Sequence, residues 1–176
     1  GGITGFTEGT PQARIYIQNC LNGGDVEFPG SFTVNGIVGF TAYTTVESCV
    51  NAGKLVWASK EYLGSIVGTV SSSSCTTIAH CYWTGGANSD KAYRLGAPVV
   101  SDSHSFNSTT YKLDKSVSGG NYTGDSLLGA LNAAADYYKF RGYSKWFLNR
   151  YKRTISFAMS NNKQSLFTTS NQLILS

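Results

Sequence analysis

The chain has few side chains that could take part in acid–base catalysis. It contains only two histidines, and 14% of its 176 residues are charged, a small share for the surface of a soluble protein. Because general acid–base catalysis needs positioned titratable groups, this composition counts against an enzyme. Ser, Thr, Asn, Gly and Tyr must cover much of the exterior instead, a balance that is common in extracellular β proteins.

Long apolar runs are missing as well. No segment approaches the roughly 18 consecutive apolar residues that a membrane-spanning helix requires, so we expect no membrane span. The chain also lacks a recognisable signal peptide and begins at Gly1 instead of Met. We therefore interpret it as a mature or excised piece of a longer exported precursor, located outside the cell or at its surface.

The positions of histidine and cysteine argue against the common metal and nucleophile motifs. No C-x-x-C pair occurs, and His80 and Cys81 are neighbours on a predicted strand, where adjacent side chains point to opposite faces. Asp102, Ser103 and His104 include the three residue types of a serine triad. Consecutive residues, however, cannot readily take the separate orientations that a triad needs. We therefore predict no catalytic residue, no metal ligand and no cofactor.

What the sequence does contain is two short phrases that recur together. The first has a β-branched residue three positions before a cysteine and a glycine four positions after it, around Cys20, Cys49 and Cys81. The second is of the type Gly-Ile-Val-Gly. Its copies occupy residues 2–5, 36–39 and 64–68. Copies about 30 residues apart are typical of stacked repeats, in which one unit cannot bury its apolar face alone.

The copies have the period of β-strands. Apolar and polar residues alternate around each cysteine, and β-branched and aromatic residues are frequent. Strands that recur with the same inward residue can stack in parallel, about 4.8 Å apart. We therefore predict a mainly β fold, a right-handed parallel β-solenoid of about three coils over residues 1–86, with a β-sandwich as the alternative. Cys20, Cys49 and Cys81 would form a core ladder, since free cysteine behaves as a small apolar residue.

Two further features fit an exported protein. Cys75 lies outside the repeated phrase, and we expect it to form a disulfide with one of the ladder cysteines. Asn107 and Asn121 each begin an N-glycosylation acceptor triplet, in a stretch that we predict to be an exposed loop. Both asparagines are therefore candidate glycosylation sites of a glycoprotein.

The repeats resemble a known family. A Gly-Ile-Val-Gly phrase followed by Ile-x-x-Cys-x-Asn-x-Gly is similar to the GLUG repeats of bacterial and protist surface proteins, and Cys81-Tyr82-Trp83 resembles the closing repeat of such arrays. The run Leu-Leu-Gly-Ala-Leu-Asn at residues 127–132 resembles the segment that follows the array in those proteins. The resemblance covers the chain from residue 1 to about residue 132. It implies a repeat architecture and a surface location, because the family has no single established activity.

The rest of the chain divides into two parts. Residues 87–124 are rich in Gly, Ser, Asn and Asp, which predicts a loop or an irregular last coil. Residues 125–138 have helical periodicity, with Asp125 or Ser126 as the N-cap. Strand-like runs follow at residues 145–148, 154–159, 166–169 and 172–175. Since the ends of a solenoid expose unpaired backbone groups, we expect residues 125–176 to form a cap or a small appended domain on the C-terminal side.

Aromatic and basic residues provide a candidate binding surface. It comprises Trp57, Tyr82 and Trp83 near the repeats, together with Lys145, Trp146, Arg150, Lys152 and Arg153 in the C-terminal part. Exposed aromatic rings can stack on sugars or anchor a protein partner. The net charge of only +4 and the exported context count against nucleic acid as a partner.

These observations favour a non-enzymatic extracellular structural or adhesive module. Its expected partners are further copies of itself, other surface proteins or glycans. The N-terminal side of the predicted solenoid has no cap, so that edge either continues into further sequence or meets another chain. The last strand, formed by Gln172, Leu173, Ile174 and Leu175, could be donated to a neighbour and so produce head-to-tail filaments. The alternative function is a carbohydrate-binding or carbohydrate-cleaving domain of a surface enzyme.

Overall fold

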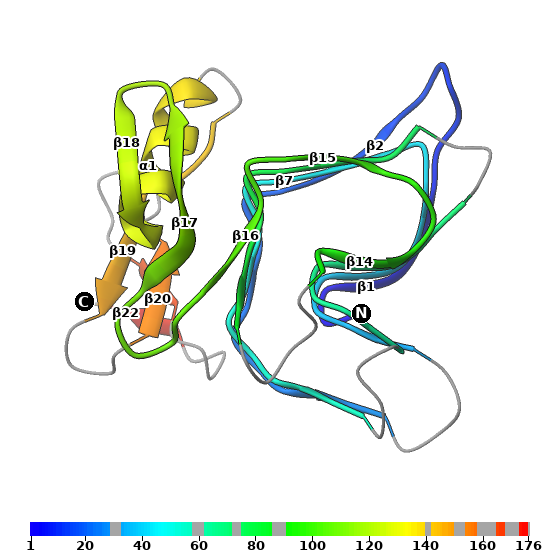
Figure 1. Cartoon of the computed structure of the whole chain (residues 1–176), viewed down its shortest axis with the longest axis horizontal. Helices are drawn as coiled ribbons and strands as arrows, with labels where there is room; N and C mark the ends of the chain where they lie inside the picture. The colour runs from blue at the N-terminus through cyan, green and yellow to red at the C-terminus, as the bar shows by residue number, and fades with distance from the viewer. Residues whose placement is uncertain are drawn as a thin grey trace.

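The protein is mainly β, with parallel sheets and one helix near the C-terminus (Figure 1). A computed structural model describes residues 1–28, 33–57, 62–71, 75–85, 91–139, 142–149, 154–157, 165–167 and 173–175. The predicted fold class is confirmed at this level.

Three larger sheets carry the repeats. Sheet A has the order β1-β6-β11-β14, formed by β1 Thr4–Glu8, β6 Val38–Ala42, β11 Val67–Val70 and β14 Tyr93–Leu95. Sheet B has the order β2-β7-β12-β15, formed by β2 Ile15–Gln18, β7 Thr44–Glu47, β12 Thr77–Ala79 and β15 Val99–Ser101. Sheet C begins with the order β3-β8-β13-β16, formed by β3 Leu21–Asn22, β8 Val50–Asn51, β13 Tyr82–Thr84 and β16 His104–Phe106. Two short parallel sheets pair β4 Val26–Glu27 with β9 Leu55–Val56, and β5 Val34–Asn35 with β10 Leu63–Gly64.

The chain visits the three larger sheets in a fixed order. It runs from sheet A through sheet B to sheet C and then returns to sheet A, one strand further along each time; Figure 1 shows these passes nearly superposed. Copies of the repeated phrase are in register, because Ile17 pairs with Val46 and Val46 with Ile78. This parallel pairing of successive copies differs from the antiparallel pairing of a β-sandwich.

The segment 87–124 contains more regular structure than its composition predicted. Its strands β14, β15 and β16 form the last parallel strands of sheets A, B and C. Val100 pairs with Ile78 and so takes the β-branched position of the repeat, and Ser103 takes the position of the cysteine. The sequence allowed an irregular last coil here, but serine in place of cysteine and the missing Gly-Ile-Val-Gly phrase obscured the regular strand pairing.

A residue with left-handed backbone turns the chain between sheets B and C in each pass. Asn19, Ser48, His80 and Asp102 have φ angles of 53°, 53°, 50° and 44°. Few residues other than glycine adopt this conformation, although Asn, Asp and His do so more readily than most. His80, which the sequence placed on a strand, is therefore a corner residue.

The repeated cysteines lie in a row inside the stack. The thiols of Cys20, Cys49 and Cys81 each donate to the carbonyl oxygen two residues earlier, at 3.2, 3.3 and 3.3 Å. The hydroxyl of Ser103 donates in the same way at 2.9 Å. Cys49 and Cys81 are fully buried. Burial raises the pKa of the Cys49 thiol, which keeps it neutral and unreactive.

All four cysteines are free thiols, including the exposed Cys75, so the expected disulfide is not formed in this structure. Because thiol reactivity requires an accessible thiolate, we expect Cys75 alone to react rapidly with an aromatic disulfide reagent in the native protein. The other three should react only after denaturation, as absorbance of the released aromatic thiolate would show. A native protein without any fast-reacting thiol would contradict this assignment of Cys75.

A row of asparagines explains why the two phrases recur together. Asn22 Nδ2 donates to Asn51 Oδ1 at 2.9 Å, and Asn51 Nδ2 donates to the carbonyl oxygen of Ser65 at 3.2 Å. The amide group of Asn51 lies directly against Gly36, where a Cβ atom would collide with it. The asparagine of the cysteine phrase therefore occupies the space that the glycine of the other phrase leaves free. Trp83 takes the asparagine position in the next pass.

The C-terminal part begins with an antiparallel hairpin and the helix. The hairpin is formed by β17 Lys112–Gly119 and β18 Tyr122–Ser126, and α1 spans Leu127–Tyr137. Ser126 is the N-cap of α1, and its hydroxyl accepts from the amide of Gly129 at 3.2 Å. The remaining strands pair β19 Trp146–Asn149 with β20 Thr154–Phe157, and β21 Ser165–Phe167 with β22 Leu173–Leu175.

The helix lies on the flank of the stack and not over its end (Figure 1). Leu127 and Leu131 are buried in one cluster with Val50, Tyr82 and Phe106 of sheet C. The outer face of sheet C is apolar, and the helix covers it. We call residues 112–149 the flanking module. The expected position of the cap thus differs from the observed one. When the helix covers an apolar sheet face, more apolar surface is removed from water than when it covers a strand edge.

One buried carboxylate joins the flanking module to sheet B. Glu47 Oε2 accepts from the hydroxyl of Tyr143 at 2.6 Å and from Gln18 Nε2 at 3.0 Å, and Glu47 is only 4% exposed. A buried carboxylate with several donors is strongly favoured over one without partners. This contact fixes the flanking module against the stack.

Candidate functional site

The described residues offer neither a metal cluster nor a membrane-spanning helix. Within the ranges given above, no group of three or more His, Cys, Asp and Glu residues is placed to hold a metal ion. In the same part of the chain, no helix has the length and apolar character needed to cross a bilayer.

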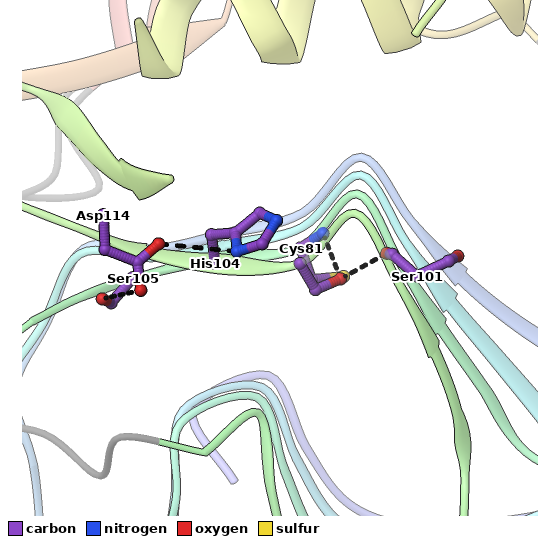
Figure 2. A network of polar contacts seen from close by, with 6 residues as sticks. Cys81, Ser101, His104, Ser105 and Asp114 are labelled. Carbon is purple, nitrogen blue, oxygen red and sulfur yellow. Dashed lines mark hydrogen bonds and ion pairs between the residues drawn. The ribbon is translucent and has the colours of Figure 1, made fainter. Parts of the chain in front are cut away.

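Asp102, Ser103 and His104 do not form a catalytic triad. The Ser103 hydroxyl donates to the carbonyl oxygen of Ser101 and accepts from the amide of Cys81 at 3.0 Å. His104 Nδ1 instead lies 3.4 Å from Asp114 Oδ1 (Figure 2). In a triad the serine bonds to the imidazole. Because the Ser103 hydroxyl bonds to backbone groups and His104 to Asp114, the bond between serine and imidazole is not formed.

The predicted aromatic and basic surface is dispersed in the structure. Tyr82, Trp83 and Trp146 are 1%, 4% and 3% exposed, so they pack in the interior. Trp57 is half-buried, with its ring centroid 6.4 Å from Phe28 and 6.5 Å from Tyr62. Lys145 forms an ion pair with Asp136 at 2.7 Å. Arg150, Lys152 and Arg153 lie outside the described residues.

Both candidate glycosylation sites are exposed. Asn107 Oδ1 accepts from the amides of Thr109 and Thr110 at 2.9 and 3.0 Å, which shapes the turn after β16. Asn121 lies at the tip of the hairpin between β17 and β18. Both positions are therefore accessible to a modifying enzyme.

The predicted donor strand is paired within its own chain. In the hairpin of β21 and β22, Leu173 pairs with Phe167, Ile174 with Leu166 and Leu175 with Ser165. Gln172 lies outside the described residues. One backbone edge of this strand is thus already occupied.

Two open strand edges are the strongest candidate site. We call β1 and β2 the N-terminal edge, and β14 and β15 the C-terminal edge, since these strands end sheets A and B. Large apolar side chains are exposed at both: Ile3 (45%), Phe6 (59%), Ile15 (37%) and Tyr16 (55%) at or beside the N-terminal edge, and Leu95 (56%), Val99 (61%) and Val100 (40%) at the C-terminal edge. Edges of this kind are usually shielded, because they invite pairing with another chain.

These exposed side chains are the ends of rows that run through the stack. Ile17, Val46, Ile78 and Val100 form one row, in which Val46 and Ile78 are fully buried. Phe6, Phe40, Thr69 and Leu95 form another on sheet A, and the rings of Phe6 and Phe40 stack with centroids 5.0 Å apart. The C-terminal edge is formed by strands within residues 87–124, for which the sequence left a loop or an irregular last coil open.

Comparisons with protein-family models, with curated proteins and with solved structures find no match to this chain.

Proposed function

We propose that the chain is a non-enzymatic structural module, a right-handed parallel β-solenoid that acts outside the cell and stacks head to tail with further copies of itself. The observation that carries this proposal is that the outward rows of sheets A and B end in exposed apolar side chains at both edges, while the inward row of sheet B ends in the half-buried Ile17 and the exposed Val100. A row whose last side chain is exposed can be extended by one more strand with the same pattern of side chains.

A second copy fits the rows in register. If its N-terminal edge pairs with the C-terminal edge of the first copy, Ile17 of the second copy lies next to Val100 of the first. Ile17 and Val46 are neighbours within one chain in the same way. On the outer faces, Phe6 of the second copy lies next to Leu95 of the first, and Tyr16 lies next to Val99. These pairs continue the rows that the strands form within one chain. Main-chain pairing supplies affinity, and the buried side chains add about 25 cal/mol per Å² of apolar surface.

The two edges differ, so the contact is heterologous and produces a filament unless the rotation closes a ring. Sheet C takes no part, because β17 already pairs with β16 at Phe106 and Leu113. The side chain of Asp114 also bonds there with His104 and Ser105. The flanking module would then project from the side of the filament.

A pair of valine variants tests the proposal. Val100→Asp should abolish self-association and leave the fold intact, because Val100 is already 40% exposed in a single copy and a carboxylate there would be buried only in the contact. Val56→Asp is the matched control, since Val56 is 42% exposed but lies on β9, away from both edges. Sedimentation velocity over a range of concentrations and electron microscopy measure the assembly, and circular dichroism measures the fold.

Two results would contradict this contact. A wild-type chain that stays monomeric at high concentration removes assembly altogether. Assembly that survives Val100→Asp but disappears on deletion of residues 171–176 would instead assign it to donation of the last strand.

A further inference from the structure

A cleft of about 280 Å³ separates the stack from the flanking module. Three elements that are distant in the sequence line it: the corner between sheets B and C with His80 and Asp102, the tip of the β17–β18 hairpin, and the last turns of α1. In Figure 1 this corner faces β17 and α1. The cleft is independent of the two edges and of the proposed assembly.

Tyrosine rings form much of the lining. Tyr137 and Tyr138 lie perpendicular, at an interplanar angle of 90° with centroids 4.8 Å apart, and the ring of Tyr138 also meets that of His80 at 5.9 Å. Tyr122 also lines the cleft, whereas Tyr82 borders it with only 1% of its surface exposed. The hydroxyl of Tyr122 is engaged with the backbone of Ser126, accepting from its amide at 2.7 Å, so the ring is fixed in place.

Asp102 is the acidic residue of the cleft lining. Its exposed carboxylate forms no ion pair among the described residues. Burial raises the pKa of the Tyr82 hydroxyl, and Cys81 and Asp102 add to this effect, which places the carboxylate within electrostatic reach of that ring. The C-terminus of α1 ends at the cleft with Tyr138 as its C-cap and no basic residue in its last turn. The end of a helix dipole there favours a cation.

We propose that this cleft binds a quaternary ammonium group, such as the trimethylammonium head of choline. Aromatic faces beside a carboxylate attract such a group, and each desolvated cation–π contact contributes about 0.5–2 kcal/mol. A trimethylammonium group has no hydrogen-bond donors, so it leaves none unpaired in a lining that also contains Ala130, Ala133 and Ala134. A sugar, by contrast, would require polar partners for several hydroxyls.

The full chain is titrated calorimetrically with choline and with its neutral isostere, in which a tert-butyl group replaces trimethylammonium. This comparison separates the effect of charge on binding from the effect of shape. Choline should bind at least about tenfold more tightly than the isostere, because the isostere cannot make the desolvated cation–π contact. Titrations with phosphocholine and with trimethyl-lysine then show whether the quaternary ammonium group belongs to a lipid or glycan headgroup or to a modified side chain.

Asp102→Asn and Tyr137→Ala should each weaken choline binding by about tenfold. Both residues are exposed, so neither change should affect folding. Asp125→Asn and Tyr62→Ala are the matched controls, since neither residue lines the cleft and Tyr62 is 36% exposed, and they should bind choline as the wild type does. Equal affinity for choline and the isostere, no binding of choline at millimolar concentrations, or tighter binding of glucose than of choline would each overturn the proposal.

Discussion

A chain that carries Cys49→Asp is expected to lose its cooperative folded state. Cys49 is fully buried and lies between Cys20 and Cys81 in the interior row. An unpaired carboxylate in that place costs about 3–5 kcal/mol, a large part of the roughly 5–15 kcal/mol that stabilises a typical domain. Urea denaturation followed by circular dichroism would show a midpoint shifted to very low denaturant or no folded baseline.

Two other cysteine variants make this prediction specific. Cys75→Asp introduces the same carboxylate at an exposed cysteine and should change the free energy of unfolding by less than about 0.5 kcal/mol. Cys81→Ser should cost only about 1–2 kcal/mol, because Ser103 shows that a hydroxyl can make the same bond to the carbonyl two residues earlier. If Cys49→Asp melted like the wild type, the interior placement of the row would be wrong.

Gly36→Ala is the second substitution with a large expected effect. A Cβ atom at Gly36 would collide with the carbonyl oxygen of Ser65 and with the amide group of Asn51, neither of which can move without breaking the hydrogen bond between them. Overpacking against backbone typically costs about 1–3 kcal/mol, and the loss of a buried hydrogen bond adds about 1 kcal/mol or more. The thermal midpoint should fall by several degrees or more.

Gly5→Ala is the control, because Gly5 lies on β1, which pairs with the strand that follows Gly36. No atom lies within 4 Å of a Cβ built at Gly5, so alanine should be neutral there or stabilise slightly through the unfolded state. Equal stability of the two alanine variants would show that glycine at position 36 serves no packing role.

The sequence determined the class of fold and the periodicity of its strands. Alternation around Cys20, Cys49 and Cys81 has the period of a strand, and copies about 30 residues apart allow like residues to stack in parallel. Helical periodicity and the capping preference of Ser126 were likewise local signals, and α1 falls within the predicted range. Such features depend on a residue and its close neighbours in the chain, which is why they can be recognised without a structure.

Other features depended on contacts between distant segments. The strands of residues 93–106 pair with earlier passes although Ser103 replaces the cysteine, because backbone hydrogen bonds do not require the repeated side chain. The helix settled on the apolar flank of sheet C and left β14 and β15 open. The cleft likewise exists only because the corner at His80 and Asp102 meets α1. Composition and spacing carry no information on which faces meet, and burial of apolar surface across the whole molecule decides that choice.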